Sequence, residues 1–144
     1  MTDTYRTFYD RQCELAGLFS GMADELDRYS YLTALGGMLD VPEEGFMTED
    51  RLVKGCQSQV WLELAYDCDE KLRLTAYSDT LIVRGLLYIL RECINGADRT
   101  ELLNGDLFVF DKAGISELLS PTRRGGLSSI IGEIRRRAET LTER

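Results

Sequence analysis

The middle of this 144-residue chain changes its hydrophobic period, and that change limits the folds that the chain can adopt. Two short runs, 60–66 and 72–77, contain strand-forming residues in which polar and apolar side chains alternate. The polar segment 67–71 joins them, and this pattern predicts an antiparallel hairpin. The alternation also predicts that one face of the hairpin meets solvent. The residues expected on that face are Glu63, Arg73 and Thr75.

A third strand is predicted at 52–54, immediately before a turn at Gly55. On both sides of the hairpin, apolar residues instead recur with helical spacing. The predicted helices cover 4–20, 22–39, 81–91, 98–103 and a last segment that Ser120-Pro121 precedes. Ser78 or Asp79 is the expected cap of the helix that follows the hairpin. Together these elements predict one α+β domain over 1–144, with helices packed on one face of a three-stranded antiparallel sheet.

The net charge of −8 is unevenly distributed along the chain. Residues 1–50 carry three arginines against eleven acidic residues, whereas residues 121–144 carry six arginines against three glutamates. The acidic body argues against nucleic acid as a partner, because neutralising phosphates requires a basic face. The arginines of the last helix are interpreted either as a solvated helix face or as a patch for an acidic partner. They include Arg123, Arg124, Arg135, Arg136 and Arg137.

Neither a secretory leader nor a membrane span is predicted. Met1 is followed by a polar stretch that lacks a basic segment with an apolar run behind it. The longest apolar runs, such as 86–90, are far too short to cross a bilayer. We therefore expect a cytoplasmic protein with no membrane partner.

The absence of histidine narrows the chemistry that is open to this chain. It removes Ser–His and Cys–His catalysis. Because no Cys-x-x-Cys spacing occurs either, a zinc site is not expected. The acidic pairs at 43–44 and 69–70 lie in polar segments and are interpreted as solvated surface, and no glycine-rich phosphate loop is present. We expect no metal and no cofactor, so thiol chemistry remains.

Three of the four cysteines have settings that predict little reactivity. Cys13 and Cys93 fall in predicted helices and are expected to be small buried hydrophobes. Cys68 lies at the predicted hairpin tip, where its neighbours Asp67 and Asp69 disfavour a thiolate. In a reducing compartment all four are expected to be free thiols.

Cys56 has a different setting, on a predicted turn just before the first strand of the hairpin. Gly55 removes a side chain beside the sulfur. The neighbouring Lys54 and Arg51 favour the thiolate, since the thiol pKa is ordinarily about 8.5 and a nearby cation lowers it. These residues by themselves leave open whether Cys56 is a reactive thiol or a structural cysteine.

Four segments of the chain carry longer motifs. They are K-G-C-Q-S-Q-V-W at 54–61, S-D-T-L-I-V-R-G-L at 78–86, L-S-P-T-R-R-G-G-L at 119–127 and R-Y-S-Y-L-T-A-L-G at 28–36. In order and in residue type, they resemble the signature segments of the SufE/CsdE-type cysteine desulfuration proteins, which accept sulfur from cysteine desulfurases. The likeness runs in register from about residue 25 to about residue 138.

This resemblance implies an α+β fold shared with iron–sulfur scaffold proteins. It implies that Cys56 takes persulfide sulfur from a pyridoxal-phosphate cysteine desulfurase (SufS-like) and passes it to an iron–sulfur scaffold (SufBCD-like). Such a carrier stimulates the desulfurase and has no independent turnover and no cofactor of its own. It also implies that Arg123 lies near the Cys56 loop. Asp79 falls in the region that the family uses to regulate exposure of this loop, although a helix-capping role accounts for it equally well.

The chain departs from the family pattern at two places. Leu118 stands where members often carry a histidine, so a proton-transfer role for that histidine does not apply. The first 20 or so residues match poorly, so Cys13 gains no function from the resemblance.

Two other functions stay open, a purely allosteric activator of the desulfurase and a peroxide-sensing thiol protein. For the carrier we expect a monomer or weak homodimer. We also expect Cys56 to be partly buried at rest, because a permanently exposed low-pKa thiol is vulnerable to oxidation.

Overall fold

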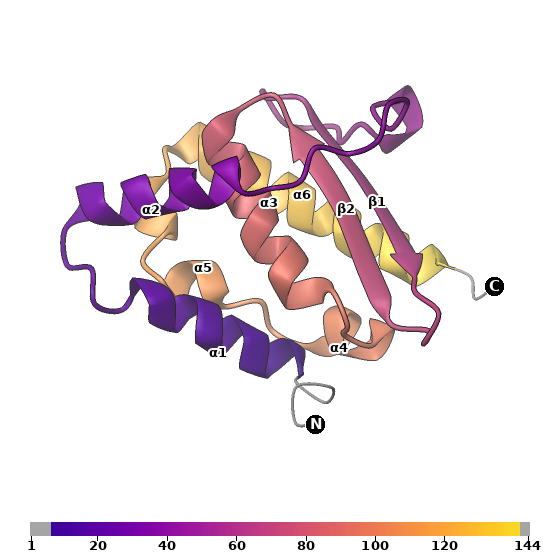
Figure 1. Cartoon of the computed structure of the whole chain (residues 1–144), viewed down its shortest axis with the longest axis horizontal. Coiled ribbons are helices and arrows are strands. Elements are labelled where there is room, and N and C mark those ends of the chain that lie inside the picture. The colour runs from indigo at the N-terminus through magenta and orange to yellow at the C-terminus, as the bar shows by residue number, and fades with distance from the viewer. Residues whose placement is uncertain (1–6, 142–144) are drawn as a thin grey trace.

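The hairpin predicted at the centre of the sequence forms one side of the molecule, and helices cover one of its faces (Figure 1). The computed structural model describes residues 7–141. Its strands are β1 (Val60–Tyr66) and β2 (Leu72–Ser78). Its helices are α1 (Phe8–Phe19), α2 (Glu25–Gly37), α3 (Leu81–Ile94), α4 (Arg99–Asn104), α5 (Val109–Lys112) and α6 (Pro121–Thr140), with single 3₁₀ turns at Glu49–Arg51 and Ser116–Leu118. The α+β class is therefore confirmed.

The hairpin buries one face and exposes the polar positions of the other, as the alternation predicts. β1 and β2 pair antiparallel, with Val60 opposite Ser78 and Tyr66 opposite Leu72. Leu62, Leu64 and Leu74 point into the core, where α3 contacts β2 and α6 contacts β1. The predicted solvent-facing residues Glu63, Arg73 and Thr75 are all exposed.

The predicted third strand is wrong. Leu52 forms only an isolated bridge with Trp61, and the Val53 N–H donates to the Val60 carbonyl at 2.8 Å. Immediately before Leu52, residues Glu49–Arg51 form a 3₁₀ helix. The guanidinium of Arg137 from α6 donates to the carbonyl of Leu62 at 2.9 Å and to that of Asp50 at 2.8 Å. The Arg137 side chain therefore binds a carbonyl of β1 at the edge where a third strand would pair. The described sheet has two strands.

The predicted capping of α3 is also corrected. The N-cap is Thr80, and no side-chain capping bond is made to the helix. Ser78 instead ends β2, and its hydroxyl accepts the Thr80 N–H at 3.2 Å. The Asp79 carboxylate instead accepts the N–H of Gln59, in the loop that contains Cys56. In contrast, α6 begins at Pro121, within the Ser120-Pro121 pair predicted to precede it, and the Ser120 hydroxyl accepts the Arg123 N–H at 3.1 Å.

Two glycines bring α2 unusually close to α3 and so fix where α3 begins. A Cβ atom on Gly36 would overlap the carbonyl oxygen of Leu81, and one on Gly85 would overlap that of Leu32. The crossing of the two helices is visible in Figure 1. This contact anchors the start of α3 at the end of the sheet where β1 begins.

The arginines of the last helix are mostly structural, which neither interpretation from the sequence anticipated. Arg135 donates to the carbonyls of Leu102 and Gly105. Arg136 and Arg137 pair with Glu133, with nitrogen–oxygen distances of 2.6 Å. The bonds of Arg135, and those of Arg137 to the carbonyls of Leu62 and Asp50, hold α6 against the rest of the domain, whereas both pairs with Glu133 lie within α6. No helix within residues 7–141 has both the length and the apolarity that crossing a membrane requires.

Candidate functional site

Cys56 lies in a loop whose backbone conformation depends on Gly55 and on contacts with α6. We call residues 54–59 the Cys56 loop. Gly55 has a φ of +87°, in the left-handed region that favours glycine. A Cβ atom there would also lie 2.8 Å from the Ser129 hydroxyl oxygen. That hydroxyl donates to the Gly55 carbonyl at 3.3 Å, so the bend before Cys56 requires a glycine.

The Cys56 side chain is half-buried and packs against the core. Its thiol donates to the Gly126 carbonyl at 3.5 Å. Beside it lies a cavity of about 20 Å³, large enough for about one water molecule. The apolar lining residues are Val60, Val83, Leu86, Leu127 and Ile130, and Gln57, Ser58, Thr122 and Arg123 contribute the polar ones. The partly buried position expected for Cys56 is confirmed.

The protonation state of Cys56 depends on burial and on a single cation. Burial raises the pKa of the thiol above its ordinary value, and the positive charge of Arg123 partly opposes that rise. The expectation that Lys54 and Arg51 favour the thiolate is wrong. Lys54 is exposed and faces Glu49 at 3.9 Å, while Arg51 donates to the Phe46 carbonyl at 3.0 Å.

Four side chains from three segments form one hydrogen-bonded series, which we call the Arg123–Asp79 network. Arg123 Nη1 donates to Ser58 Oγ at 2.8 Å. A hydrogen bond of 2.7 Å joins Ser58 Oγ to Thr80 Oγ1, and Thr80 Oγ1 donates to Asp79 Oδ1 at 3.0 Å. The same carboxylate oxygen accepts the Gln59 N–H at 3.2 Å. Arg123 and Asp79, both predicted from the sequence, thus meet at the Cys56 loop.

Sequence reasoning missed Ser58 within the loop, and it also missed Thr80, Gly126 and Ser129, which contact the loop through a hydroxyl or a carbonyl. Ser58, Thr80 and Gly126 lie inside the segments that resemble the family motifs, so the motifs could have pointed to these three residues. Ser129 lies just beyond the last of these segments, and no local pattern distinguishes it. Its role follows only from the approach of α6 to Gly55.

The other three cysteines differ from Cys56 in burial. Cys93 is fully buried as predicted, and burial raises its pKa to about 12. Cys13 is half-buried, and is thus less buried than the small buried hydrophobe that the sequence predicts. It lies on the partly exposed side of α1, where it accepts a hydrogen bond from Tyr9 that helps raise the tyrosine pKa. Cys68 is exposed at the hairpin tip. Within residues 7–141, no three Cys, Asp or Glu side chains cluster as a metal site would require.

Comparisons with known proteins agree with the motifs around this site. The family described as "SufE: Fe-S metabolism associated domain" matches residues 13–138. The cysteine desulfuration protein SufE of Wigglesworthia glossinidia brevipalpis is 32% identical over 124 residues, covering 85% of this chain and 86% of the relative. An uncharacterized SufE-like protein of Rhizobium etli is 36% identical over 125 residues, covering 84% of each.

A solved structure agrees with the fold. The solution structure of a hypothetical protein from Thermus thermophilus superposes with a TM-score of 0.74 at 20% identity, covering 90% of this chain and 94% of that one. At that identity the likeness concerns the fold alone. The family match and the curated relatives cover most of the chain, including the Cys56 loop and the starts of α3 and α6. The chain therefore belongs to the SufE family, whose role lies in iron–sulfur metabolism and cysteine desulfuration.

Proposed function

We propose that Cys56 is a sulfur carrier, which accepts persulfide sulfur from a pyridoxal-phosphate cysteine desulfurase and delivers it to an iron–sulfur scaffold. The observation that carries the proposal is the setting of this thiol. Cys56 alone among the four cysteines combines partial burial, an adjacent apolar cavity and a nearby cation in the described structure. It also lies within the stretch that resembles the family's signature segment.

The transfer is a thiol–persulfide exchange. The Cys56 thiolate attacks the terminal sulfur of the persulfide on the desulfurase cysteine. A new sulfur–sulfur bond forms on Cys56 as the original one breaks, and the desulfurase cysteine leaves as a thiolate that takes up the proton. Delivery repeats the exchange with an acceptor thiol. No net oxidation occurs, so the carrier needs no cofactor of its own.

At rest, the environment of Cys56 favours the neutral thiol. Burial disfavours the charged form, and the Gly126 carbonyl accepts a hydrogen bond that only the protonated sulfur can donate. Movement of the Cys56 loop toward a desulfurase would remove both effects. The carrier therefore becomes nucleophilic where a persulfide is present and stays protected elsewhere.

The cavity beside Cys56 suits a carrier that must hold sulfur between encounters. Its volume of about 20 Å³ accommodates roughly one atom beyond the cysteine sulfur. A sulfur atom that filled this cavity, against apolar walls that include Leu86 and Ile130, would leave no room for a water molecule, which would slow loss of the terminal sulfur. Arg123 at the rim would stabilise the anionic persulfide. We assign Asp79 to holding the loop rather than to proton transfer, because its carboxylate accepts the loop N–H of Gln59.

The experiment mixes the protein with a SufS-like cysteine desulfurase and cysteine, and intact-mass spectrometry counts added sulfur. Wild-type protein is expected to gain a sulfur that a reductant removes. Cys56→Ser protein should gain none. Cys68→Ser is the matched control, because it removes an exposed thiol from the opposite end of the hairpin, and it should load normally.

The same mixtures distinguish the alternatives. Equal loading of Cys56→Ser protein would contradict the assignment of the carrier residue. Cys56→Ser protein that still stimulates desulfurase turnover in full would favour an allosteric activator. Sulfenic acid formed at Cys56 by peroxide, with no effect of the desulfurase, would indicate a thiol sensor.

A further inference from the structure

The Arg123–Asp79 network connects three parts of the chain at the Cys56 loop. Ser58 belongs to the loop, Asp79 and Thr80 lead into α3, and Arg123 lies in the first turn of α6. Ser58, Thr80 and Arg123 are half-buried, whereas Asp79 is exposed. The network therefore runs from the wall of the Cys56 cavity to the surface.

The two ends of the network have fixed roles. The Arg123 guanidinium can only donate, and the Asp79 carboxylate can only accept. Between them, Ser58 Oγ accepts from Arg123 and from the Thr80 hydroxyl. The Thr80 hydroxyl also lies within donating distance of Asp79 Oδ1, so its one proton is shared between two acceptors. A positive and a negative charge thus end the series, and the charge at each end polarises the hydroxyls between them.

The bonds through Ser58 are the shortest of the side-chain hydrogen bonds described for this loop. They measure 2.7 Å and 2.8 Å. Ser129 reaches the Gly55 carbonyl at 3.3 Å, and the Cys56 thiol reaches Gly126 at 3.5 Å. The bond from Arg123 has a charged donor, and such bonds are stronger than neutral ones. Together with the hydroxyl bond to Thr80, it makes the Ser58 side chain the main attachment between the loop and the starts of the two helices.

We propose that Ser58 and Thr80 are positioning residues for Cys56, whose hydroxyls tie the loop to the starts of α3 and α6 and hold the sulfur over its cavity. The inference rests on the proposed sulfur-carrier function and adds residues that act on Cys56 through the loop. Neither hydroxyl touches the sulfur in a described hydrogen bond. Loss of either one interrupts the same network, so the two residues act as a unit.

The test measures how fast iodoacetamide alkylates Cys56 in the isolated protein between pH 7 and pH 10. All variants are made in a Cys68→Ser background, because trypsin cleaves after Lys54 and Lys71 and would leave Cys56 and Cys68 on one peptide. The rate constant of the ionised thiol, taken from the pH profile, reports exposure of the sulfur separately from its ionisation. The variants are Ser58→Ala, Thr80→Val and the double variant, with Thr80→Ser as the conservative control.

We expect Ser58→Ala and Thr80→Val each to raise this rate constant roughly five- to tenfold, the effect of losing one strong hydrogen bond on loop opening. Thr80→Ser keeps the hydroxyl and should react like the background protein. The double variant should match the faster single variant, because both substitutions break one network. Alkylation of the fully buried Cys93 should not change, which shows that the fold is intact.

Several results would overturn the proposal. One is an unchanged rate constant in Ser58→Ala and Thr80→Val, and another is a double variant whose effect is the product of the two single effects. Equal acceleration at Cys93 would show general loosening of the fold instead of loop release. The assay contains no desulfurase, so its outcome is independent of sulfur loading, and failure of the carrier proposal would appear only in the loading experiment.

Discussion

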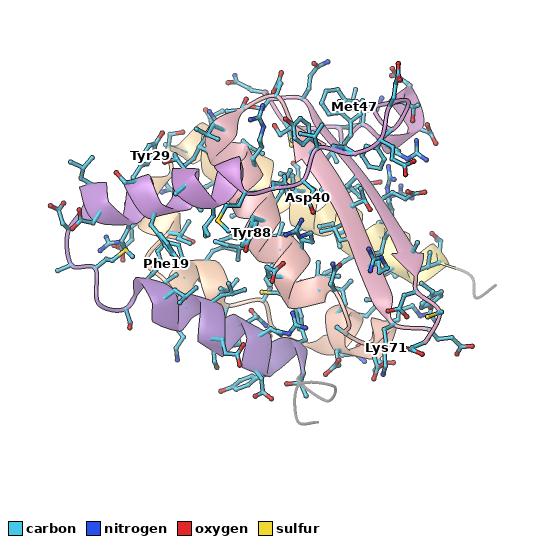
Figure 2. The ribbon with its side chains drawn as sticks, viewed as in Figure 1. Phe19, Tyr29, Asp40, Met47, Lys71 and Tyr88 are labelled. Atoms are coloured by element: carbon cyan, nitrogen blue, oxygen red, sulfur yellow. The ribbon has the colours of Figure 1, made fainter. Side chains whose placement is uncertain are left out.

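A cysteine lies near each end of the hairpin, Cys68 in its tip and Cys56 in the loop before β1. Different kinds of contact hold the two ends. The hairpin tip, residues 67–71, is held mainly by its own residues. The Asp67 carboxylate accepts the N–H groups of Asp69 and Lys71 at 2.8 Å and 3.0 Å. The Cys56 loop at the opposite end is held by distant residues of α3 and α6. Figure 2 shows Lys71 at the tip, far from Met47 at the other end of the sheet.

This difference in construction explains the difference between the two thiols. A self-contained turn projects into solvent, so Cys68 is exposed, with carboxylates on both sides. The Cys56 loop is covered by the starts of two helices, which supply an apolar cavity and the Arg123 cation. Tertiary contacts, and not the turn itself, thus provide the conditions that a protected but usable thiol needs.

The largest expected effect concerns thiol reactivity at the two ends, with Cys93 as the buried reference. At pH 8 we expect iodoacetamide to alkylate Cys68 fastest, Cys56 more slowly and Cys93 slowest. With a pKa of about 12, Cys93 has a thiolate fraction of about 10⁻⁴ at that pH. Peptide mass spectrometry of Cys56→Ser and Cys68→Ser proteins resolves the first two sites. Equal rates at Cys56 and Cys68 would show that the Cys56 loop is open at rest.

The next effect is an alkaline loss of stability that arises in the interior. Burial raises the folded-state pKa of Cys93 from 9.0 to about 12. The unfolded chain therefore releases this proton first, and the free energy of unfolding falls as the pH rises above 9. By pH 11 this loss should reach about 2–3 kcal/mol. Urea unfolding at several pH values should show a shallower decline for Cys93→Ala, and an identical decline would contradict the prediction.

A third effect has opposite signs at the two ends of the hairpin. Gly55→Ala should lower the free energy of unfolding by about 1–3 kcal/mol, because it strains a left-handed residue and crowds Ser129. At the tip, Glu70 has a φ of 63° although it is not a glycine. Glu70→Gly should therefore raise stability, by about 0.5 kcal/mol. Denaturant titration checks both, and a loss of stability in both variants would remove this contrast.

The smallest effect is expected at the ion pair beside the tip. Lys71 Nζ lies 2.6 Å from Asp98 Oδ1, but both side chains are largely exposed. Lys71→Met should change the free energy of unfolding by less than about 1 kcal/mol. Sulfur loading of Cys56 should stay at the wild-type level. A loading defect in this variant would show that the two ends of the hairpin are coupled.

Local sequence patterns predicted much of the framework. Alternation over 60–66 and 72–77 gave both strands and their exposed residues Glu63, Arg73 and Thr75. The Ser120-Pro121 pair gave the start of α6. These features depend on residues within a turn or strand of one another, and such interactions are present in the sequence order itself. The four motif segments added the family and pointed to Cys56, Arg123 and Asp79.

Prediction from neighbouring residues was wrong where a residue far along the chain makes the contact that a sequence neighbour was expected to make. It selected Lys54 as the cation near Cys56 because Lys54 is close in sequence, yet Lys54 faces Glu49. It extended the sheet to 52–54, where Arg137 of α6 takes the place of a strand. It gave Asp79 a helix cap, whereas the carboxylate binds the Cys56 loop.

The sequence by itself determined the hairpin, the α+β class, most helix positions and the thiol on which function is proposed. Only the tertiary structure decided which residues hold the Cys56 loop, which side chains cover the thiol and which cation lies near it. Ser58 meets Arg123 across 65 residues and Thr80 across 22. The physical reason is that hydrogen bonds and charges act through space, so the partners of the Cys56 loop exist only after α3 and α6 have packed against the hairpin.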